Sequence, residues 1–281
     1  MSDQFSNLLS PRRLTEIVDI GANMIDGAPP YAGMLSAGLC RVTGFEPQES
    51  ALGELLQQKG PNERYLPHAL GDGREHTLNV CLASGMTSLY EPDPVVLKSF
   101  EVLRQLAMVT HRIPLQTRTL DSIPEITELD FLKIDIQGSE LAVFEGGTAK
   151  LSEAVVVQTE VSFVTLYKDQ PTLGEVDREM RRQGFLPHCF AEVKQWPIAP
   201  YVSPRHPREA INQLLEADIV YVRDFTRPEL IPDEKLKHMA LVAHHCYGSF
   251  DLALRCVMLL EQRHALAGGA QDRYLQLLPQ K

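Results

Sequence analysis

Residues 131–140, FLKIDIQGSE, decide the fold of this chain. An apolar run carries Asp135 near its end, a turn follows at Gly138, and a helical pattern starts at Ser139. This order predicts a buried strand that delivers an acidic side chain to the carboxyl edge of a sheet. Ligands of open α/β sheets bind at that edge, because helix amino ends and strand-to-helix loops converge there. The ordinary start of a loop would use similar residues, so this stretch alone leaves a binding role open.

The length and the charge of the chain narrow the classes of partner. Its 281 residues are enough for one large α/β domain with a smaller appendage. Lys and Arg number 27 and Asp and Glu number 37, so the formal net charge is -10. A surface that binds phosphates needs clustered cations, and nucleic acid is therefore not an expected partner.

The cysteines and the apolar segments predict a location. The five cysteines are odd in number and widely spaced, with no Cys-x-x-Cys pair, which indicates a reducing compartment. Residues 1–10 lack a basic region followed by an apolar core, so we expect no signal peptide. The apolar segment 252–260 contains Arg255 and is too short to span a bilayer. We expect a soluble, cytoplasmic protein.

A strand, a loop of small residues, a helix and a second strand open the chain. Residues 14–20 are typical of a strand and run into residues 21–23 (GAN), where small side chains let a ligand approach the backbone. Pro30 suits the first turn of a helix that continues to about Leu39. The second strand, residues 41–45, ends at Glu46. This plan is one nucleotide-binding half of a doubly wound sheet.

Two classes of cofactor share this plan. A dinucleotide site needs Gly-x-Gly-x-x-Gly for the pyrophosphate and an acidic residue about 20 positions later. Residues 21–23 break that glycine pattern, and Asp19 stands just before the loop. S-adenosylmethionine carries an ammonium group, for which Asp19 is a sensible partner, and a ribose, for which Glu46 is suitably placed. The residues therefore favour S-adenosylmethionine, and a nicotinamide-dependent oxidoreductase is the alternative.

Alternating strands and helices follow, and the chain ends in a long helical tail. Further strands are expected at residues 65–70, 77–82, 113–119, 154–161, 185–193 and 217–223, where 77–82 forms an antiparallel hairpin after a turn at residues 72–73. Further helices are expected at residues 51–59, 91–110, 173–183 and 233–278, the last with a break at Gly248. The tail exceeds what the sheet needs. We therefore expect a domain at 1–232 and a helical extension at 233–281 that covers the active site or joins two subunits.

The order of five segments gives a specific resemblance. VDIGAN, GFEPQ, HALGDG, TRTLDSI and FLKIDIQGSELAVFEGG together resemble the FkbM-type family of S-adenosylmethionine-dependent methyltransferases, over roughly residues 14–223. The resemblance implies a Rossmann-like class I methyltransferase sheet, mostly parallel with an antiparallel closing strand. It also implies an O-methylated hydroxyl as the usual product, often on a sugar or polyketide. Family positions and the end of strand 65–70 place the cofactor at Asp19, Gly21, Ala22, Asn23, Glu46, Ala69, Leu70 and Asp135.

The chain departs from the family pattern at two positions. Family members usually carry Gly two residues after the Asn, whereas this chain has Ile25 there and reaches a glycine at Gly27. The loop must take a different path around the methionine end of the cofactor. The family's Glu after Asp135 is Gln137 here. An amide cannot take a proton as a carboxylate does, so we expect Gln137 to contact the acceptor and to be a poor general base.

Asp135 and Glu160 are candidate metal ligands. Residues 154–161, AVVVQTEV, predict a central strand that ends in Glu160, next to the strand that ends in Asp135. This disposition is similar to that of the divalent-ion ligands in metal-dependent O-methyltransferases, and two such carboxylates can hold Mg²⁺ with water and acceptor oxygens. The alternative is that Asp135 contacts only the cofactor and that Glu160 is a polar strand end facing the acceptor.

The remaining candidates lie downstream. The long insertion at residues 194–215 contains the only Trp, Trp196, and a basic cluster with His206, and loops of this length are often functional. We expect Trp196 and Tyr167 to contact the acceptor, although a packed Tyr is commoner. His188 and His206 are candidate bases, because imidazole exchanges a proton near neutral pH. A structural role is the alternative for each.

The sequence therefore predicts a methyltransferase that moves a methyl group from S-adenosylmethionine to a hydroxyl of a small molecule, glycan or natural product. Proton removal would come from a His or from a metal near Asp135. A cofactor-binding module without transfer activity is the alternative that Ile25 and Gln137 suggest. No residue selects among the hydroxylated acceptors.

Overall fold

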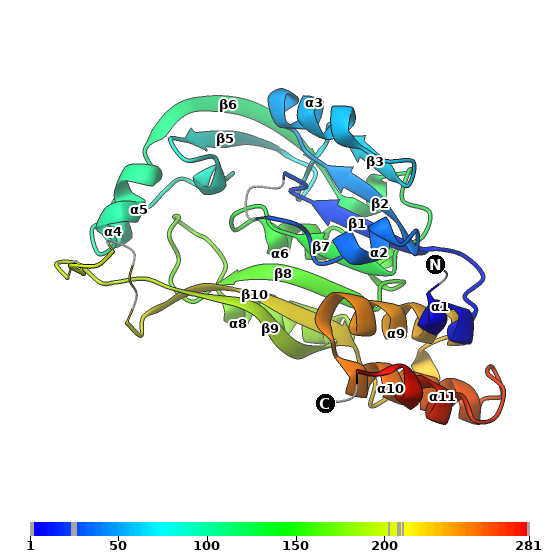
Figure 1. The fold of residues 1–281 in the computed structure, drawn as a ribbon. Coiled ribbons are helices and arrows are strands. Elements are labelled where there is room, and N and C mark those ends of the chain that lie inside the picture. Colours follow the sequence, from blue (N-terminus) through cyan, green and yellow to red (C-terminus); the bar gives the residue numbers. More distant parts are fainter. Residues whose placement is uncertain (1–2, 24–26, 202, 207–208, 210, 280–281) are drawn as a thin grey trace.

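A seven-stranded, mostly parallel sheet lies at the centre of the computed structural model, which describes residues 3–23, 27–201, 203–206, 209 and 211–279 (Figure 1). The strand order is β3-β2-β1-β7-β8-β10-β9, and β10 runs antiparallel to both of its neighbours. This arrangement confirms the predicted Rossmann-like sheet with an antiparallel closing strand. The strands are β1 (Thr15–Ile20), β2 (Cys40–Phe45), β3 (Glu63–Leu66), β7 (Phe131–Ile134), β8 (Val156–Ser162), β9 (Phe185–Gln195) and β10 (Leu214–Arg223).

The strand order reverses between β1 and β7. The chain first builds outward from β1 to β2 and β3, and later returns to place β7 on the other side of β1. In register, Asp19 pairs with Lys133 and Ile20 pairs with Ile134. The loops that follow β1 and β7 therefore leave the sheet side by side, and this topological switch point is where ligands of such sheets bind.

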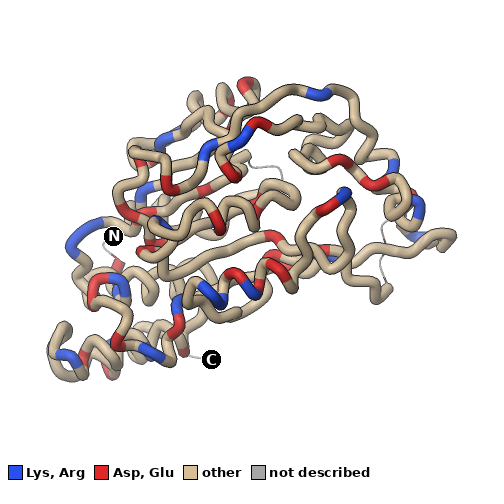
Figure 2. The backbone as a smooth tube through the Cα atoms, turned by 180° about the vertical axis from the view of Figure 1, so that it is seen from behind, with Lys and Arg blue, Asp and Glu red and all other residues tan. Residues whose placement is uncertain are grey.

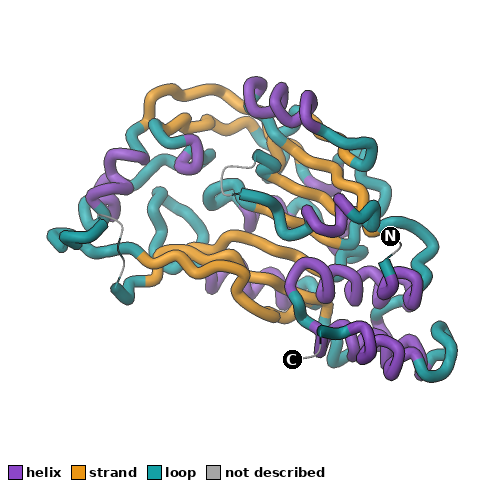
Figure 3. The backbone as a smooth tube through the Cα atoms, in the orientation of Figure 1, coloured by secondary structure: helices purple, strands orange, loops and turns teal. Residues whose placement is uncertain are grey.

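Helices cover both faces of the sheet (Figure 3). On one face, Ile17 and Phe131 share an apolar core with Met34 of α2 and Leu236 of α9. The helices of the described chain are α1 (Gln4–Leu9), α2 (Ala32–Ser36), α3 (Glu49–Gln58), α4 (Pro94–Leu97), α5 (Glu101–Leu106), α6 (Glu140–Glu145), α7 (Thr148–Leu151), α8 (Leu173–Arg182), α9 (Asp233–Tyr247), α10 (Phe250–Gln262) and α11 (Ala270–Leu277).

The opposite face packs against α6 and α8. Val18, Leu132 and Val157 of the sheet share a second core with Phe144 of α6 and Met180 of α8. Central strands that are covered on both faces are expected to be almost entirely apolar. The polar side chains at the carboxyl ends of these strands are therefore candidates for binding a ligand.

A smaller sheet, ordered β4-β6-β5, joins the main one (Figure 1). Here β4 (Ala69–Leu70) runs parallel to β6 (Val109–Arg118), and β6 runs antiparallel to β5 (Glu75–Cys81). A third apolar core contains Phe100 of the α4–α5 segment and Leu215 of β10. This core ties the smaller sheet to the long strands β9 and β10.

One predicted strand and one predicted hairpin are wrong in detail. Residues 65–70 do not form a single strand, because β3 ends at Leu66 and β4 starts at Ala69 in the other sheet. Pro67 between them has no N–H to donate to a ladder. The strand at 77–82 is antiparallel as expected, but its partner is β6 and not the strand before the turn.

The single helix predicted at residues 91–110 is also wrong. The segment forms α4 and α5, and its last two residues, Val109 and Thr110, begin β6. Phe100 separates the two helices in a non-helical conformation (φ -133°, ψ 79°), and its side chain is buried in the third core. Burial of this aromatic ring therefore overrides the helical pattern.

The helical tail has the predicted break. Helix α9 ends at Tyr247, and Gly248 adopts a left-handed conformation (φ 60°), which favours glycine, before α10 begins. The tail helices share the first apolar core with β1 and β7. The extension thus packs directly on the sheet. The division of the chain into 1–232 and 233–281 stays a prediction.

The distribution of charge and the lengths of the helices are relevant to binding of nucleic acids and membranes. Figure 2 shows Lys and Arg interspersed with Asp and Glu along the backbone, for example on α8. Within the described ranges, no helix combines the length and the apolar character that crossing a membrane requires.

Candidate functional site

A cavity of about 570 Å³ lies at the carboxyl edge of β1, β2 and β7, and the smaller sheet contributes Leu78 and Leu115 to its wall. All of the residues predicted to hold the cofactor line it, namely Asp19, Gly21, Ala22, Asn23, Glu46, Ala69, Leu70 and Asp135. Ile25 lies outside the described residues, so the expected path of the longer loop stays a prediction. The structure therefore brings the four segments of the predicted cofactor site together.

Gly21 is required where the loops after β1 and β7 meet. Its φ is +81°, and a Cβ added at this position would lie 2.1 Å from the Asp135 carbonyl oxygen. Any other residue would force the two loops apart. The absence of a side chain at Gly21 therefore allows the backbone after β1 to lie against the backbone of Asp135.

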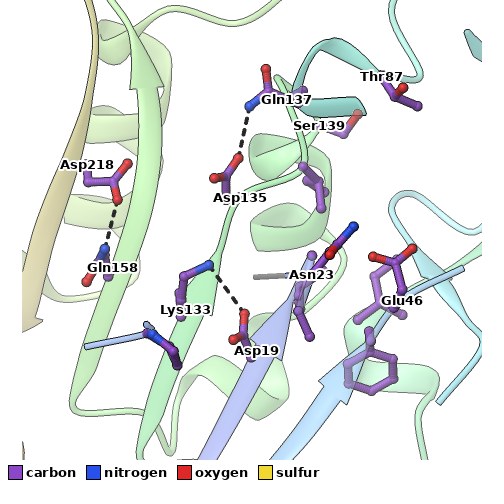
Figure 4. Close-up of a pocket in the computed structure, with 18 of the residues that line it drawn as sticks. Asp19, Asn23, Glu46, Thr87, Lys133, Asp135, Gln137, Ser139, Gln158 and Asp218 are labelled. Atoms are coloured by element: carbon purple, nitrogen blue, oxygen red, sulfur yellow. Dashed lines mark hydrogen bonds and ion pairs between the residues drawn. The ribbon is translucent and has the colours of Figure 1, made fainter. Parts of the chain in front are cut away.

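Glu46 presents a carboxylate to the cavity, next to Asn23 (Figure 4). Only 3% of Glu46 is exposed, and its Oε1 accepts a hydrogen bond of 2.8 Å from the Gln48 backbone N–H. Burial raises the pKa of this carboxyl above its ordinary range. A held carboxylate of this kind is suited to accept hydrogen bonds from a pair of hydroxyl groups.

Ser139 shows that the cavity is polar beyond its carboxylates. Its Oγ is buried, and the described part of the chain gives it no hydrogen-bond partner. Ser139 also lines the cavity. A buried hydroxyl without a partner costs free energy unless a ligand or water satisfies it. Together with Gly21 and Glu46, Ser139 gives the cavity features that fit a bound polar cofactor such as S-adenosylmethionine.

Asp19 is less available than the sequence predicts. Its carboxylate accepts a hydrogen bond of 2.5 Å from the Tyr31 hydroxyl, and Lys133 Nζ lies 3.5 Å from it. Burial raises the pKa of Asp19, and Lys133 opposes this effect. A cofactor ammonium would therefore compete with Lys133, whereas the half-buried Asp135 carboxylate faces the same cavity (Figure 4).

Gln137 bridges the two carboxylates that were candidate metal ligands. Its Nε2 donates to Asp135 Oδ1 at 3.0 Å and to Glu160 Oε2 at 2.9 Å, while its Oε1 accepts from the Tyr167 hydroxyl at 3.2 Å. Its backbone φ is +56°, unusual for a residue other than glycine, and its carbonyl accepts from Ser88 Oγ at 2.6 Å. The surrounding contacts therefore hold Gln137 in one conformation.

Mg²⁺ is not supported at this site. Carboxylate oxygens of Asp135, Glu140 and Glu160 do lie within 4.8 Å of one another. The Gln137 amide, however, already stands between Asp135 and Glu160, and Lys194 Nζ lies 3.3 Å from Glu160 Oε1. Glu140 accepts two backbone N–H groups of its own loop. Donors therefore engage both oxygens of Glu160 and one oxygen each of Asp135 and Glu140, and a cation and an amide donor stand where the ion would lie, so the residues do not fit Mg²⁺.

The structure does not gather the other candidates in the cavity. Among the described residues, His188 is not part of its lining, and His188 Nε2 lies 2.7 Å from Ser249 Oγ instead. His206 is exposed and Trp196 packs against the third apolar core, both away from the described lining. Tyr167 and Glu160 are buried behind Gln137. The roles in proton transfer of His188 and His206, and the contact of Trp196 with the acceptor, stay predictions that this lining does not support.

Several polar residues of the cavity were not predicted from the sequence. Lys133 from β7, Gln158 from β8, Asp218 from β10 and Tyr247 from α9 all line it. Gln158 Nε2 donates to Asp218 Oδ2 at 2.9 Å (Figure 4). A polar residue inside an otherwise apolar strand, as in ADIVYVR around Asp218, was the available signal.

The electrostatics of these residues are coupled. Desolvation lowers the pKa of Lys133, but Asp19, Asp135 and Asp218 outweigh it, and the net pKa is raised. Burial, with a contribution from Asp135, raises the pKa of Asp218, while Gln158 and two lysines oppose the rise. The cavity wall therefore combines a cation, Lys133, with two carboxyl groups, Asp19 and Asp218, whose pKa values burial raises.

The backbone resembles those of solved methyltransferases at low sequence identity. One is magnesium protoporphyrin IX methyltransferase from Synechocystis PCC 6803 with bound SAM, with 11% identity, 78% of this chain and 76% of that chain covered, and a TM-score of 0.37. Another is precorrin-6y C5,15-methyltransferase from Geobacter metallireducens GS-15, with 13% identity, 78% and 87% covered, and a TM-score of 0.37. No curated protein matches the chain.

The family itself is decided by a direct match. The model of the methyltransferase FkbM domain matches residues 19–187, which is more than half of the chain and includes the end of β1, the loops at the switch point and Glu160. The matched segment carries the cavity edge formed by Gly21, Glu46 and Asp135. The protein therefore belongs to the FkbM family of S-adenosylmethionine-dependent methyltransferases.

Proposed function

We propose that this methyltransferase modifies a hydroxyl group of a small molecule, with sugars and natural products as the leading classes. The observation that carries the proposal is the composition of the cavity. Glu46 and Asp135 line the cavity where β2 and β7 end, and Gln158 and Asp218 line it on β8 and β10 (Figure 4). Carboxylate and amide oxygens are hydrogen-bond acceptors that suit an acceptor rich in hydroxyl groups.

The residues divide the work of binding. When bound, S-adenosylmethionine supplies an electrophilic methyl group on a sulfonium. Glu46 would hold the ribose hydroxyls and Asp135 the ammonium, because each presents a carboxylate at the switch point. The protein's own contribution is then to align the acceptor oxygen and to exclude water.

Cofactor binding and methyl transfer test this proposal separately. Calorimetry with S-adenosylmethionine and S-adenosylhomocysteine should show binding, and NAD should show none. Label from methyl-labelled cofactor should then appear in hydroxylated acceptors, tested as neutral sugars, amino sugars, sugar acids and phenols. Amines without a hydroxyl group serve as the control, and methylation of these alone would contradict the hydroxyl assignment.

A binding module without transfer activity is the second candidate. Gln137 stands where the family's Glu is usual, and here it bridges Asp135 and Glu160 as a neutral donor. Cofactor binding without label transfer to any acceptor would favour this candidate. A mass-spectrometric comparison of cells with and without the gene, searching for a compound that gains one methyl group, would decide between the two.

The setting of the protein is also a proposal. The spacing of the cysteines supports the reducing cytoplasm. Association of two copies through the C-terminal helices is supported by the partly exposed side chain of Leu275 on α11. Light scattering coupled to size-exclusion chromatography measures the mass, and a monomer at micromolar concentration would contradict the association.

A further inference from the structure

The C-terminal helix α9 reaches the cavity with its last residue. Tyr247 lines the cavity, and its hydroxyl donates to Gln158 Oε1 at 2.8 Å. Gln158 Nε2 in turn donates to Asp218 Oδ2 at 2.9 Å. Two hydrogen bonds therefore connect the helical extension, through β8, to a carboxylate of β10 on the cavity wall.

The chemistry of the groups fixes the direction of this chain of hydrogen bonds. A carboxylate accepts only, so the amide nitrogen of Gln158 must face Asp218, and the amide oxygen must face Tyr247. Burial raises the pKa of Tyr247 well above its ordinary value, which keeps its hydroxyl a donor. Each group thus has one role, and the Asp218 carboxylate is held in one orientation.

Asp218 keeps one oxygen for a ligand. Its Oδ2 is engaged by Gln158, and no other described residue hydrogen-bonds to its Oδ1. Asp218 is half-buried and lies in register with Glu160 of β8 and Glu192 of β9. It is thereby accessible from the cavity while one of its oxygens is fixed.

Charged groups from three directions face Asp218. Asp135 and Lys133 come from the β7 segment, Lys194 comes from β9, and Glu216 lies two residues away on β10. Asp135 and Glu216 disfavour a further negative charge, whereas the two lysines favour it. Since burial is the largest contribution, the pKa of Asp218 is raised.

Position separates Asp218 from the cofactor edge. Asp135 follows β7, directly beside Gly21 at the switch point, whereas Asp218 is two strands further along the sheet. Neighbouring strands are about 4.8 Å apart, so about 10 Å separates the two strands. A carboxylate at this distance can face an acceptor that lies against the cofactor.

We infer that Asp218 is the catalytic residue that takes the proton of the acceptor hydroxyl, and that Gln158 and Tyr247 are its positioning residues. This inference rests on the proposed function. The acceptor oxygen forms a bond to the methyl carbon as the carbon–sulfur bond breaks with its electron pair passing to sulfur. The hydroxyl proton goes to the Asp218 carboxylate and from there to water. The helical extension then completes the active site through Tyr247.

Three substitutions and one matched control test the inference. Asp218→Asn removes the carboxylate, Tyr247→Phe removes the terminal hydroxyl, and Gln158→Met removes the amide between them. Tyr274→Phe is the control, because it removes a hydroxyl from the same extension, where the Tyr274 hydroxyl lies 3.0 Å from His244 Nδ1. Thermal unfolding and calorimetry with S-adenosylhomocysteine first establish that each variant is folded and binds cofactor with a Kd within about twofold of the parent.

The first readout does not need an acceptor. In nitrogen–proton spectra of the labelled protein, the side-chain amide pair of Gln158 is the pair that Gln158→Met removes. We expect this pair to shift in Tyr247→Phe and in Asp218→Asn, and to stay in place in Tyr274→Phe. An unmoved pair in Tyr247→Phe would overturn the positioning role.

The second readout is methyl transfer to whichever acceptor the parent protein uses. A general base contributes about 10²-fold or more, so kcat should fall by that factor in Asp218→Asn and by about tenfold in Tyr247→Phe. The acidic limb of the pH profile of kcat/KM should disappear in Asp218→Asn. Parental kcat in this variant would overturn the assignment of the base. Absence of transfer by the parent itself would overturn the proposed function and the base with it, and the amide spectra would still decide the positioning role.

Discussion

Lys133 Nζ lies 3.5 Å from Asp19 Oδ1, across the adjacent strands β7 and β1. Asp19 is 3% exposed, so its carboxylate depends on Lys133 and on the Tyr31 hydroxyl for compensation. We expect Lys133→Met to lower the free energy of unfolding by about 3 kcal/mol at pH 7, because an uncompensated buried charge remains. Urea unfolding followed by circular dichroism measures this change.

A second substitution controls for lost packing. Asp19→Asn combined with Lys133→Met removes both charges and keeps the hydrogen bond from Tyr31 possible. The double variant should recover most of the lost stability. If it is no more stable than Lys133→Met, packing and not charge explains the loss.

Glu46→Gln should weaken cofactor binding by about 10- to 100-fold, because hydrogen bonds to a charged group contribute about 1.5–3 kcal/mol. Calorimetry with S-adenosylhomocysteine measures the change. Glu49→Gln removes an exposed carboxylate three residues away on α3 and is the matched control. Equal effects of the two substitutions would show that general electrostatics, and not a contact at Glu46, determines affinity.

The same carboxylate sets a pH dependence. Burial raises the folded-state pKa of Glu46, so its ionised form costs stability and the cost is absent at low pH. The ligand-free parent should therefore lose stability relative to Glu46→Gln as the pH rises through that pKa. Unfolding midpoints of the ligand-free proteins across pH 4–8 give this comparison, and parallel curves would contradict it.

The sequence contains enough information for the sheet and for the cofactor edge. Residues 14–20 and 131–134 are mainly apolar and are followed by a small residue, Gly21, and an acidic one, Asp135, so the strands and the loops after them can be recognised from local sequence. The miss at residues 65–70 was within reach, since Pro67 interrupts the ladder. The break at Phe100 was not, because the third core that buries this ring is built from segments far apart in the chain.

The part of the cavity lined by Gln158, Asp218 and Tyr247 could not be predicted in the same way. Gln158, Asp218 and Tyr247 come from β8, β10 and α9, and only the folded topology brings them into contact. His188 was favoured by its chemistry alone, but β9 lines the cavity only from Cys189 onward, and His188 Nε2 lies 2.7 Å from Ser249 Oγ instead. Residue chemistry indicates what a group can do, and register decides where it does it.

Glu140 should make stability depend on pH near neutrality. Burial is the main cause that raises its pKa to about 7, with Asp135 adding to the rise and the backbone N–H groups of Ile136 and Gly138 opposing it. Because the folded pKa lies above the ordinary value, the stability that Glu140 contributes is complete at low pH and is lost as the pH rises through about 7.

We therefore expect Glu140→Gln, which keeps an oxygen for both N–H groups, to gain about 2 kcal/mol relative to the parent between pH 5 and pH 8. Urea unfolding at four pH values measures this difference. Glu145→Gln at the other end of α6 is the control, as its side chain is exposed. A constant difference between parent and Glu140→Gln across the range would contradict the prediction.

Gln137→Glu restores the acidic residue that is usual in the family and should create a requirement for a cation. The substitution places a third carboxylate between Asp135 and Glu160 in place of an amide that donates to both. Like charges at hydrogen-bond distance raise the pKa of the group, so the variant should be less stable than the parent at pH 8 and closer to it at pH 5.

Divalent cations should then separate the two proteins. With its Gln137 amide replaced, the variant offers oxygens that suit Mg²⁺, and about 10 mM MgCl₂ should raise its unfolding temperature by several degrees. The parent should not respond, because Gln137 and Lys194 already occupy these oxygens. Adding Glu160→Gln to Gln137→Glu moves the amide to the neighbouring strand and should abolish both the pH-dependent loss and the response to Mg²⁺. A parent that is stabilised by Mg²⁺ as strongly as the variant would show that the amide does not stand in for a cation.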